Sequence, residues 1–219
     1  MRRSQSSSQP VIAEIIAVGS ELLLGGRTDS NSLFITEELG SLGIAVRFKS
    51  VVGDDRADIV RVLNAAVSRA KVIVLTGGLG PTVDDCTREA IATAAGRKLV
   101  PRQEAFEAMK RRLAQWGRTP NKGQLRQALI PSGATVVHNP VGSAPGFWLS
   151  WRGATLISLP GVPSEMAAMV RESVVPLLTS QLEASGRALE PIRRHVFHTW
   201  GLAEADVDAK LQGIAPKNT

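Results

Sequence analysis

The stretch KVIVLTGGLGPTVDD, residues 71–85, joins a short apolar run to a glycine-rich turn and a pair of aspartates. Its apolar part, residues 71–76, is typical of a strand that is buried on both faces of a parallel sheet. A helix-like pattern follows over residues 84–95. We therefore interpret this stretch as a strand, a turn and a helix, the unit from which parallel sheets are built.

The same alternation precedes this stretch. A nearly continuous apolar run predicts a strand over residues 11–18, and an alternating pattern predicts one over residues 44–52. Apolar positions at helical spacing predict helices over residues 31–42 and 55–70. Short right-handed crossovers then give a parallel sheet with helices on both of its faces.

Further elements are expected beyond the turn. Strands are predicted over residues 134–138, 146–151 and 154–160, and helices over 102–116 and 163–182, whereas 118–131 has only weak periodicity. These elements define an α/β domain over residues 11–183. The Ser/Gln-rich residues 1–10 are expected to be a disordered tail. Residues 184–219 are expected to hold a linker and part of a second α+β segment, with a strand over 192–201 and a helix over 202–211.

The composition excludes several classes of protein. The single cysteine, Cys86, cannot form an intramolecular disulfide and suits a reducing compartment. With three scattered histidines, it leaves little material for a zinc site. No apolar run approaches the roughly 18 residues that a membrane span needs, and so a cytoplasmic protein is expected. The net charge of +6 is dispersed along the chain, which does not favour nucleic-acid binding.

Acidic residues recur directly after the predicted core strands. The carboxyl ends of parallel strands meet at one edge of a sheet, where ligands bind. Like charges gathered there repel one another unless a cation or a donor-rich ligand offsets them. The polar residues at this edge are Ser20, Glu21, Asp54, Asp55, Asp84, Asp85, Ser164 and Glu165.

Helix capping is the alternative for each of these positions. Thr82 and Asp85 have the spacing of a capping box, and Asp55 can cap the helix that follows it. Glu165 suits a first helical turn, where acidic side chains interact favourably with the helix dipole. Capping requires only one carboxylate at each helix, and the pairs supply more than that.

Three glycines, Gly77, Gly78 and Gly80, provide the complement to these acids. Backbone N–H groups at glycines can approach an anion closely, and the next helix N-terminus adds partial positive charge. A phosphate beside a carboxylate-held Mg²⁺-type cation would reconcile the two halves of the turn. The alternative is a tight turn without a ligand. The spacing matches neither a P-loop nor a dinucleotide-binding motif.

Five segments in this order resemble the amino-terminal half of the CinA (competence/damage-inducible protein A) family. They are IIAVGSELLLGG, VVGDD, LTGGLGPTVDD, NPVGSAPGF and LPGVPSEM, within residues 13–178. That half belongs to the molybdopterin-binding superfamily of molybdenum-cofactor biosynthesis proteins. The resemblance implies a three-layer α/β/α sandwich with a mostly parallel, mixed sheet, and association into dimers or trimers.

The resemblance also implies a chemistry. Several CinA-like proteins hydrolyse ADP-ribose to AMP and ribose 5-phosphate with a divalent metal and sometimes potassium. Asp85 matches the position of an aspartate implicated in adenylyl chemistry in molybdopterin-handling relatives, and Asp54 or Asp55 falls near a second one. Many family members carry a carboxyl-terminal domain that deamidates nicotinamide mononucleotide. Because this chain ends after the linking segment, that activity is not assigned to it.

The resulting hypothesis is a pyrophosphatase that uses Mg²⁺, Mn²⁺ or Co²⁺ on ADP-ribose or a similar nucleotide diphosphate. The alternative is a module that binds molybdopterin or a nucleotide without turnover. The expected catalytic residues are Asp54, Asp55, Asp84 and Asp85, and Asp54, Asp84 and Asp85 are also the expected metal ligands. The expected ligand-binding residues are Ser20, Glu21, Thr76, Gly77, Gly78, Gly80, Thr82, Asn139, Ser143, Ser164 and Glu165.

Overall fold

The computed structural model describes residues 10–187, 191–192 and 198–212 of the chain. Its centre is a six-stranded sheet with the strand order β2-β1-β3-β8-β7-β6. The first four strands in this order are parallel, and β7 and β6 are each antiparallel to their neighbours. The prediction of a mostly parallel, mixed sheet is therefore confirmed. The strand bounds are Val11–Val18 (β1), Ile44–Val52 (β2), Val72–Thr76 (β3), Thr135–Val137 (β6), Gly146–Trp151 (β7) and Ala154–Leu159 (β8).

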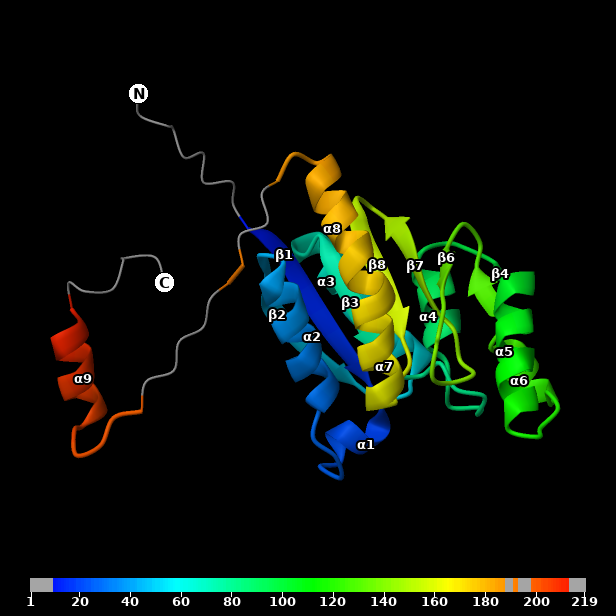
Figure 1. Ribbon diagram of the computed structural model, residues 1–219, viewed down its shortest axis with the longest axis horizontal. Coiled ribbons are helices and arrows are strands. Elements are labelled where there is room, and N and C mark those ends of the chain that lie inside the picture. The colour runs from blue at the N-terminus through cyan, green and yellow to red at the C-terminus, as the bar shows by residue number, and fades with distance from the viewer. Residues whose placement is uncertain (1–9, 188–190, 193–197, 213–219) are drawn as a thin grey trace.

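Helices cover both faces of the sheet, as Figure 1 shows. One face packs against α2, α7 and α8, and the other packs against α3 and α4. The result is the expected three-layer α/β/α sandwich. The helix bounds are Ser20–Leu23 (α1), Ser30–Ser41 (α2), Arg56–Arg69 (α3), Thr87–Ala94 (α4), Gln103–Gln115 (α5), Lys122–Arg126 (α6), Pro163–Met169 (α7), Val175–Ala184 (α8) and Glu204–Leu211 (α9).

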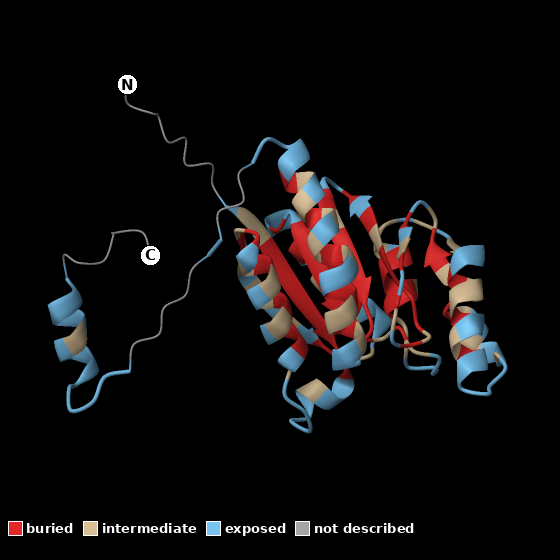
Figure 2. Ribbon diagram, in the orientation of Figure 1, coloured by how far each residue is buried: buried red, intermediate tan, exposed pale blue. Residues whose placement is uncertain are grey.

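The apolar runs of the central strands fill two separate cores. Successive side chains of a strand point to opposite faces of the sheet. Ile15 of β1 and Val74 of β3 therefore pack on the side of α2 and α7, whereas Ile16 and Leu75 pack on the side of α3 and α4. Figure 2 shows the buried strands between the two helix layers. This double burial explains why these strands read as continuous apolar runs.

The helix predicted over residues 163–182 contains a π turn. Between α7 and α8, residues Val170–Val174 form a π-helix. Pro176 lies in the first turn of α8 and has no N–H to donate to a carbonyl in the preceding turn. A widened turn next to this proline accommodates the missing hydrogen bond.

A small second sheet was not predicted. It pairs β4 (Leu99–Pro101) with β5 (Leu129–Pro131) in antiparallel register. Both strands have only three residues, which is too short for a period-two pattern to be recognised. Helix α6 lies in the same weakly periodic region, where Asn121 and Gln124 form a capping box at its start.

The carboxyl-terminal elements are only partly described. The helix expected over residues 202–211 is α9. Of the strand expected over 192–201, Ile192 and residues 198–201 form no strand, and residues 193–197 lie outside the described residues. The expected tail also lies outside them, apart from Pro10. Among the described helices, none has the length and apolar character needed to cross a membrane.

Candidate functional site

The glycine loop, residues 77–85, follows the buried strand β3 and is shaped by close backbone contacts. Gly77 and Gly78 have φ angles of +108° and +66°, in the region that favours glycine. A Cβ atom at Gly77 would collide with the Val18 carbonyl oxygen at the end of β1, and one at Gly78 would collide with the Thr87 hydroxyl. The tight turn therefore requires glycine at both of these positions, whether or not a ligand binds.

The three glycines do not offer their N–H groups equally. Gly77 donates its N–H to the Leu159 carbonyl of β8 at 3.0 Å, and Gly80 donates to the Asp85 carboxylate at 2.8 Å. Within the described part of the chain, the N–H groups of Gly78 and Leu79 have no acceptor. An anion could thus bind the N–H of half-buried Gly78, whereas Leu79 is fully buried and Gly77 and Gly80 maintain the loop.

Asp85 closes the glycine loop and does not cap a helix. Its carboxylate accepts hydrogen bonds from the backbone N–H groups of Gly80 and Thr82, both at 2.8 Å, and from the Thr82 hydroxyl at 2.5 Å. The capping-box interpretation of this pair is wrong, because helix α4 begins only at Thr87, with Cys86 as its N-cap residue. The helix expected from residue 84 accordingly begins three residues later.

A buried arginine supports the loop from the protein interior. Arg88 is 1% exposed, and its guanidinium donates hydrogen bonds to the carbonyls of Leu79 at 2.8 Å and Gly80 at 3.0 Å. Burial lowers the pKa of Arg88, and the charges of Glu89 and Asp85 act in the opposite direction. Because Arg88 binds these two carbonyls on the interior side of the loop, the opposite side of the loop backbone can face the cavity.

Beside the glycine loop lies a cavity of about 520 Å³, which we call the large cavity. Acidic side chains reach it from the ends of four parallel strands, so the structure brings these predicted groups together. Arg27 is the one basic residue among the described residues that line it. The predicted site residues in its lining are Glu21, Asp54, Gly77, Gly78, Gly80, Thr82, Asp84, Asp85, Ser143 and Glu165.

The carboxylates of the large cavity differ in how far they are already engaged. Asp54 accepts a hydrogen bond from the Ser20 backbone N–H at 2.8 Å, and Glu165 accepts one from the Asn139 side-chain amide at 2.7 Å. By contrast, the side-chain carboxylates of Asp84 and Glu21 accept no hydrogen bond and form no ion pair within the described residues. These two are the acids most available to a ligand or a cation.

Several predicted site residues lie outside the large cavity. Asp55 caps helix α3 by accepting a hydrogen bond from the Asp58 N–H at 2.9 Å, which confirms the capping alternative for this residue. Ser20 lies outside the lining but donates its backbone N–H to Asp54. Asn139 also lies outside it and donates its side-chain amide to Glu165. The predicted residues outside its lining are Ser20, Asp55, Thr76, Asn139 and Ser164.

The expected metal ligands do not form a closed cluster. Among the residues that the structure describes, no group of three or more His, Cys, Asp or Glu side chains could hold a metal ion. Asp54, Asp84 and Asp85 all line the large cavity, but the Asp85 oxygens already bind loop donors. A hard divalent cation would take its remaining ligands from phosphate oxygens and water, as Mg²⁺ does in many phosphate sites. The metal assignment stays a prediction.

A second, smaller cavity of about 220 Å³ adjoins the large one. Asn31, which is 8% exposed, lies in its wall and donates side-chain hydrogen bonds to the Thr76 hydroxyl and the Gly161 carbonyl, both at 2.9 Å. This side chain joins the start of α2 to the ends of β3 and β8. Residues lining both cavities are Val18, Glu21, Arg27, Gly161 and Pro163.

Sequence reasoning missed Arg27, Asn31, Arg88 and Gln127. Arg27 lies in a loop without periodicity, and the partners of Asn31 are 45 and 130 residues away in the sequence. Gln127, also buried, donates to the Leu79 carbonyl at 3.4 Å and lines the large cavity. A polar residue in the weakly periodic region gave no signal of such a contact.

Comparison with known proteins places this site within a family. The family model described as a probable molybdopterin binding domain matches residues 14–180. A CinA-like protein of Rippkaea orientalis is 43% identical over 200 residues, which are 91% of this chain and 47% of that protein. The chain belongs to the CinA-like family. It spans about half the length of the curated CinA-like relatives it matches.

Solved structures agree with this assignment. The crystal structure of CinA from Thermoplasma acidophilum is 34% identical with a TM-score of 0.70, and the match covers 81% of this chain and 99% of that one. The molybdopterin biosynthesis enzyme MoaB from Thermus thermophilus is 24% identical with a TM-score of 0.56, covering 82% and 99% of the two chains. The second likeness shows a shared fold for this CinA-like domain.

Proposed function

We propose that this CinA-like domain hydrolyses the pyrophosphate bond of ADP-ribose or of a similar nucleotide diphosphate, with a divalent metal. One observation carries the proposal. The glycine loop, in which the Gly78 N–H has no acceptor among the described residues, borders the same cavity as acids from four strand ends. A cavity with five carboxylates would reject a phosphate by itself, whereas a phosphate accompanied by a cation satisfies both sets of groups.

In this proposal the loop backbone binds phosphate, and the carboxylates bind water and the cation. The Gly78 N–H would hold one phosphoryl group. Asp84 and Glu21, which have no partner in the described part of the chain, would orient a water molecule and hold the cation. Bound Mg²⁺, Mn²⁺ or Co²⁺, with potassium as a further expected ion, would neutralise phosphate charge and acidify a water.

In the proposed reaction, the oxygen of water forms a bond to one phosphorus atom. The bond between that phosphorus and the bridging oxygen breaks, and a proton from the water passes to the Asp84 carboxylate. The bridging oxygen leaves with the second phosphate, so that ADP-ribose and water yield AMP and ribose 5-phosphate.

The test is mass spectrometry of ADP-ribose incubated with the protein and each of the three metals. We expect AMP and ribose 5-phosphate, and we expect Asp84→Asn to slow their formation at least tenfold, as the loss of a general base does. Asp208→Asn is a matched control, since Asp208 is exposed on α9, far along the chain from the cavities. No product with any of the metals would sink the proposal.

Binding without turnover is the second candidate. The description of the matching family, together with the lack of a three-group metal cluster among described residues, favours a module that holds molybdopterin or a nucleotide. Saturable binding of molybdopterin or AMP, without hydrolysis of ADP-ribose in the presence of any of the three metals, would support it. Association into dimers or trimers and a cytoplasmic location stay predictions.

A further inference from the structure

The charge balance of the two cavities is unusual for a site that receives an anion. The large cavity has five acidic residues and one basic residue in its described lining, and the small cavity has Glu21 and Asp29 with one basic residue. The basic residue is Arg27 in both cases. A phosphorylated ligand therefore meets a single protein cation at the point where the two cavities join.

Arg27 is free to bind such a ligand. It is exposed, lies in the loop between α1 and α2, and forms no ion pair or hydrogen bond within the described residues. Although Glu21 and Asp29 line the same small cavity, neither carboxylate lies within ion-pairing distance of the Arg27 guanidinium. All five guanidinium N–H donors remain available, and they form a planar fork that matches two phosphate oxygens.

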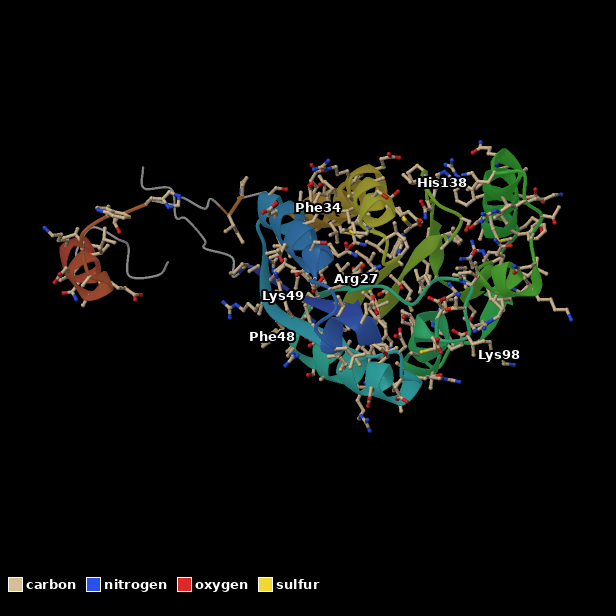
Figure 3. All side chains as sticks on the ribbon, turned by 90° about the horizontal axis from the view of Figure 1, so that it is seen from below. Arg27, Phe34, Phe48, Lys49, Lys98 and His138 are labelled. Carbon is tan, nitrogen blue, oxygen red and sulfur yellow. The ribbon has the colours of Figure 1, made fainter. Side chains whose placement is uncertain are left out.

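The position of Arg27 is specific, because other uncommitted basic residues lie elsewhere. Figure 3 looks onto the edge of the sheet where α1 lies. In this view Arg27 lies between Lys49 on one side and Lys98 on the other. Both lysines are exposed, and so is Arg47 of β2, yet none of the three lines either cavity. Arg27 thus differs from these three surface residues in lining both cavities.

The geometry points to Arg27 as the anchor for a second phosphoryl group of the ligand, bound where the two cavities share their lining. This inference rests on the proposed function and adds a division of labour to it. The first phosphoryl group binds the Gly78 N–H, and the second binds the Arg27 fork. The preferred ligands are then molecules with two linked phosphoryl groups rather than one.

The test compares inorganic phosphate with pyrophosphate by calorimetry, with MgCl₂ present because of the surrounding carboxylates. We expect the wild-type protein to prefer pyrophosphate, and Arg27→Ala to weaken pyrophosphate binding roughly tenfold or more while changing phosphate binding by less than about twofold. Arg27→Lys, which keeps the charge without the planar fork, should recover only part of the loss.

Arg47→Ala is the matched control. It also removes an exposed arginine side chain, but from strand β2 at a position that lines neither cavity. Pyrophosphate affinity that is unchanged in Arg27→Ala would overturn the inference, and so would equal weakening of phosphate and pyrophosphate. Failure of ADP-ribose hydrolysis with a retained, Arg27-dependent preference for pyrophosphate would overturn the proposed function alone. Hydrolysis without that preference would overturn only the role of Arg27.

Discussion

Arg88 donates a hydrogen bond from its buried guanidinium to the carbonyl of Leu79 at 2.8 Å, and so fixes the glycine loop from the interior. No carboxylate pairs with Arg88 within the described residues. We predict that Arg88→Lys lowers the free energy of unfolding by about 1–3 kcal/mol, because an ammonium group cannot reproduce the two-carbonyl fork. Urea denaturation measures this. The same substitution at exposed Arg47 should change it by less than about 0.5 kcal/mol, and equal effects would contradict the prediction.

Gly78 offers a test of the loop geometry with an internal control. Gly78→Ala places a methyl group against the buried Thr87 hydroxyl at a φ of +66°. Gly96→Ala has nearly the same φ, +64°, but meets nothing within 4 Å. We expect about 1–2 kcal/mol of destabilisation at Gly96 from the backbone alone, and a clearly larger loss at Gly78. Similar melting temperatures for the two variants would show that the loop is not tightly packed.

The two aspartates of the glycine loop should respond differently to substitution. Asp85→Ala removes the acceptor of three hydrogen bonds and should cost about 1–3 kcal/mol of stability for the donors it leaves unpaired. Asp84→Asn changes an exposed carboxylate without a partner in the described residues, so stability should stay within about 0.5 kcal/mol. Denaturation and ADP-ribose turnover should be measured on both. Loss of stability in Asp84→Asn would refute this distinction.

Glu14 is fully buried in β1, where it accepts hydrogen bonds from Arg69 at 2.8 and 2.7 Å and from Ser50 at 2.8 Å. Arg69→Met would leave this carboxylate without its cation. Because Arg69 is 39% exposed, we expect a loss of about 2–3 kcal/mol, below the cost at a fully buried pair. The double variant Glu14→Leu, Arg69→Met should recover most of it. A double variant no more stable than Arg69→Met alone would contradict this account.

Cys86 should make stability depend on alkaline pH. Burial raises the pKa of its thiol, and the charges of Asp54, Glu89 and Asp55 raise it further. The unfolded thiol then loses its proton first, near pH 8.5, so its contribution to stability is complete below that pH and is lost as the pH rises toward the folded pKa. Iodoacetamide should label the native protein more slowly than the unfolded chain at pH 8. Equal labelling rates would disprove the shift. Cys86→Ser should remove the thiol's part of the alkaline loss.

Burial on both faces made the core strands easy to predict. β1 has the predicted bounds, and β3 and β8 fall within a residue of them, because both faces of these strands needed apolar side chains. β2 also has the predicted bounds, but its burial alternates, with Arg47 and Lys49 exposed on one face. The weakly periodic region hid β5 and α6, whose stability comes from pairing and capping with partners that a local pattern does not reveal.

The site was predictable where topology alone decides it. Strand-end placement correctly brought Glu21, Asp54, Asp84 and Glu165 to one cavity. It could not separate the glycines by function, since the N–H of Gly77 is taken by a carbonyl 82 residues further along the chain. Loop residues such as Arg27 carry no periodic signal, so only their position in three dimensions shows that they line a cavity.

The antiparallel strands β6 and β7 have a consequence for how this domain can change. Their connecting turn reaches the large cavity at Ser143, although both strands lie at one side of the sheet, beyond the parallel core. One wall of the cavity is thus supplied by a peripheral hairpin rather than by the central framework. Because Ser143 is only half-buried and lies outside the central sheet, a substitution there should change this wall of the cavity with little effect on folding.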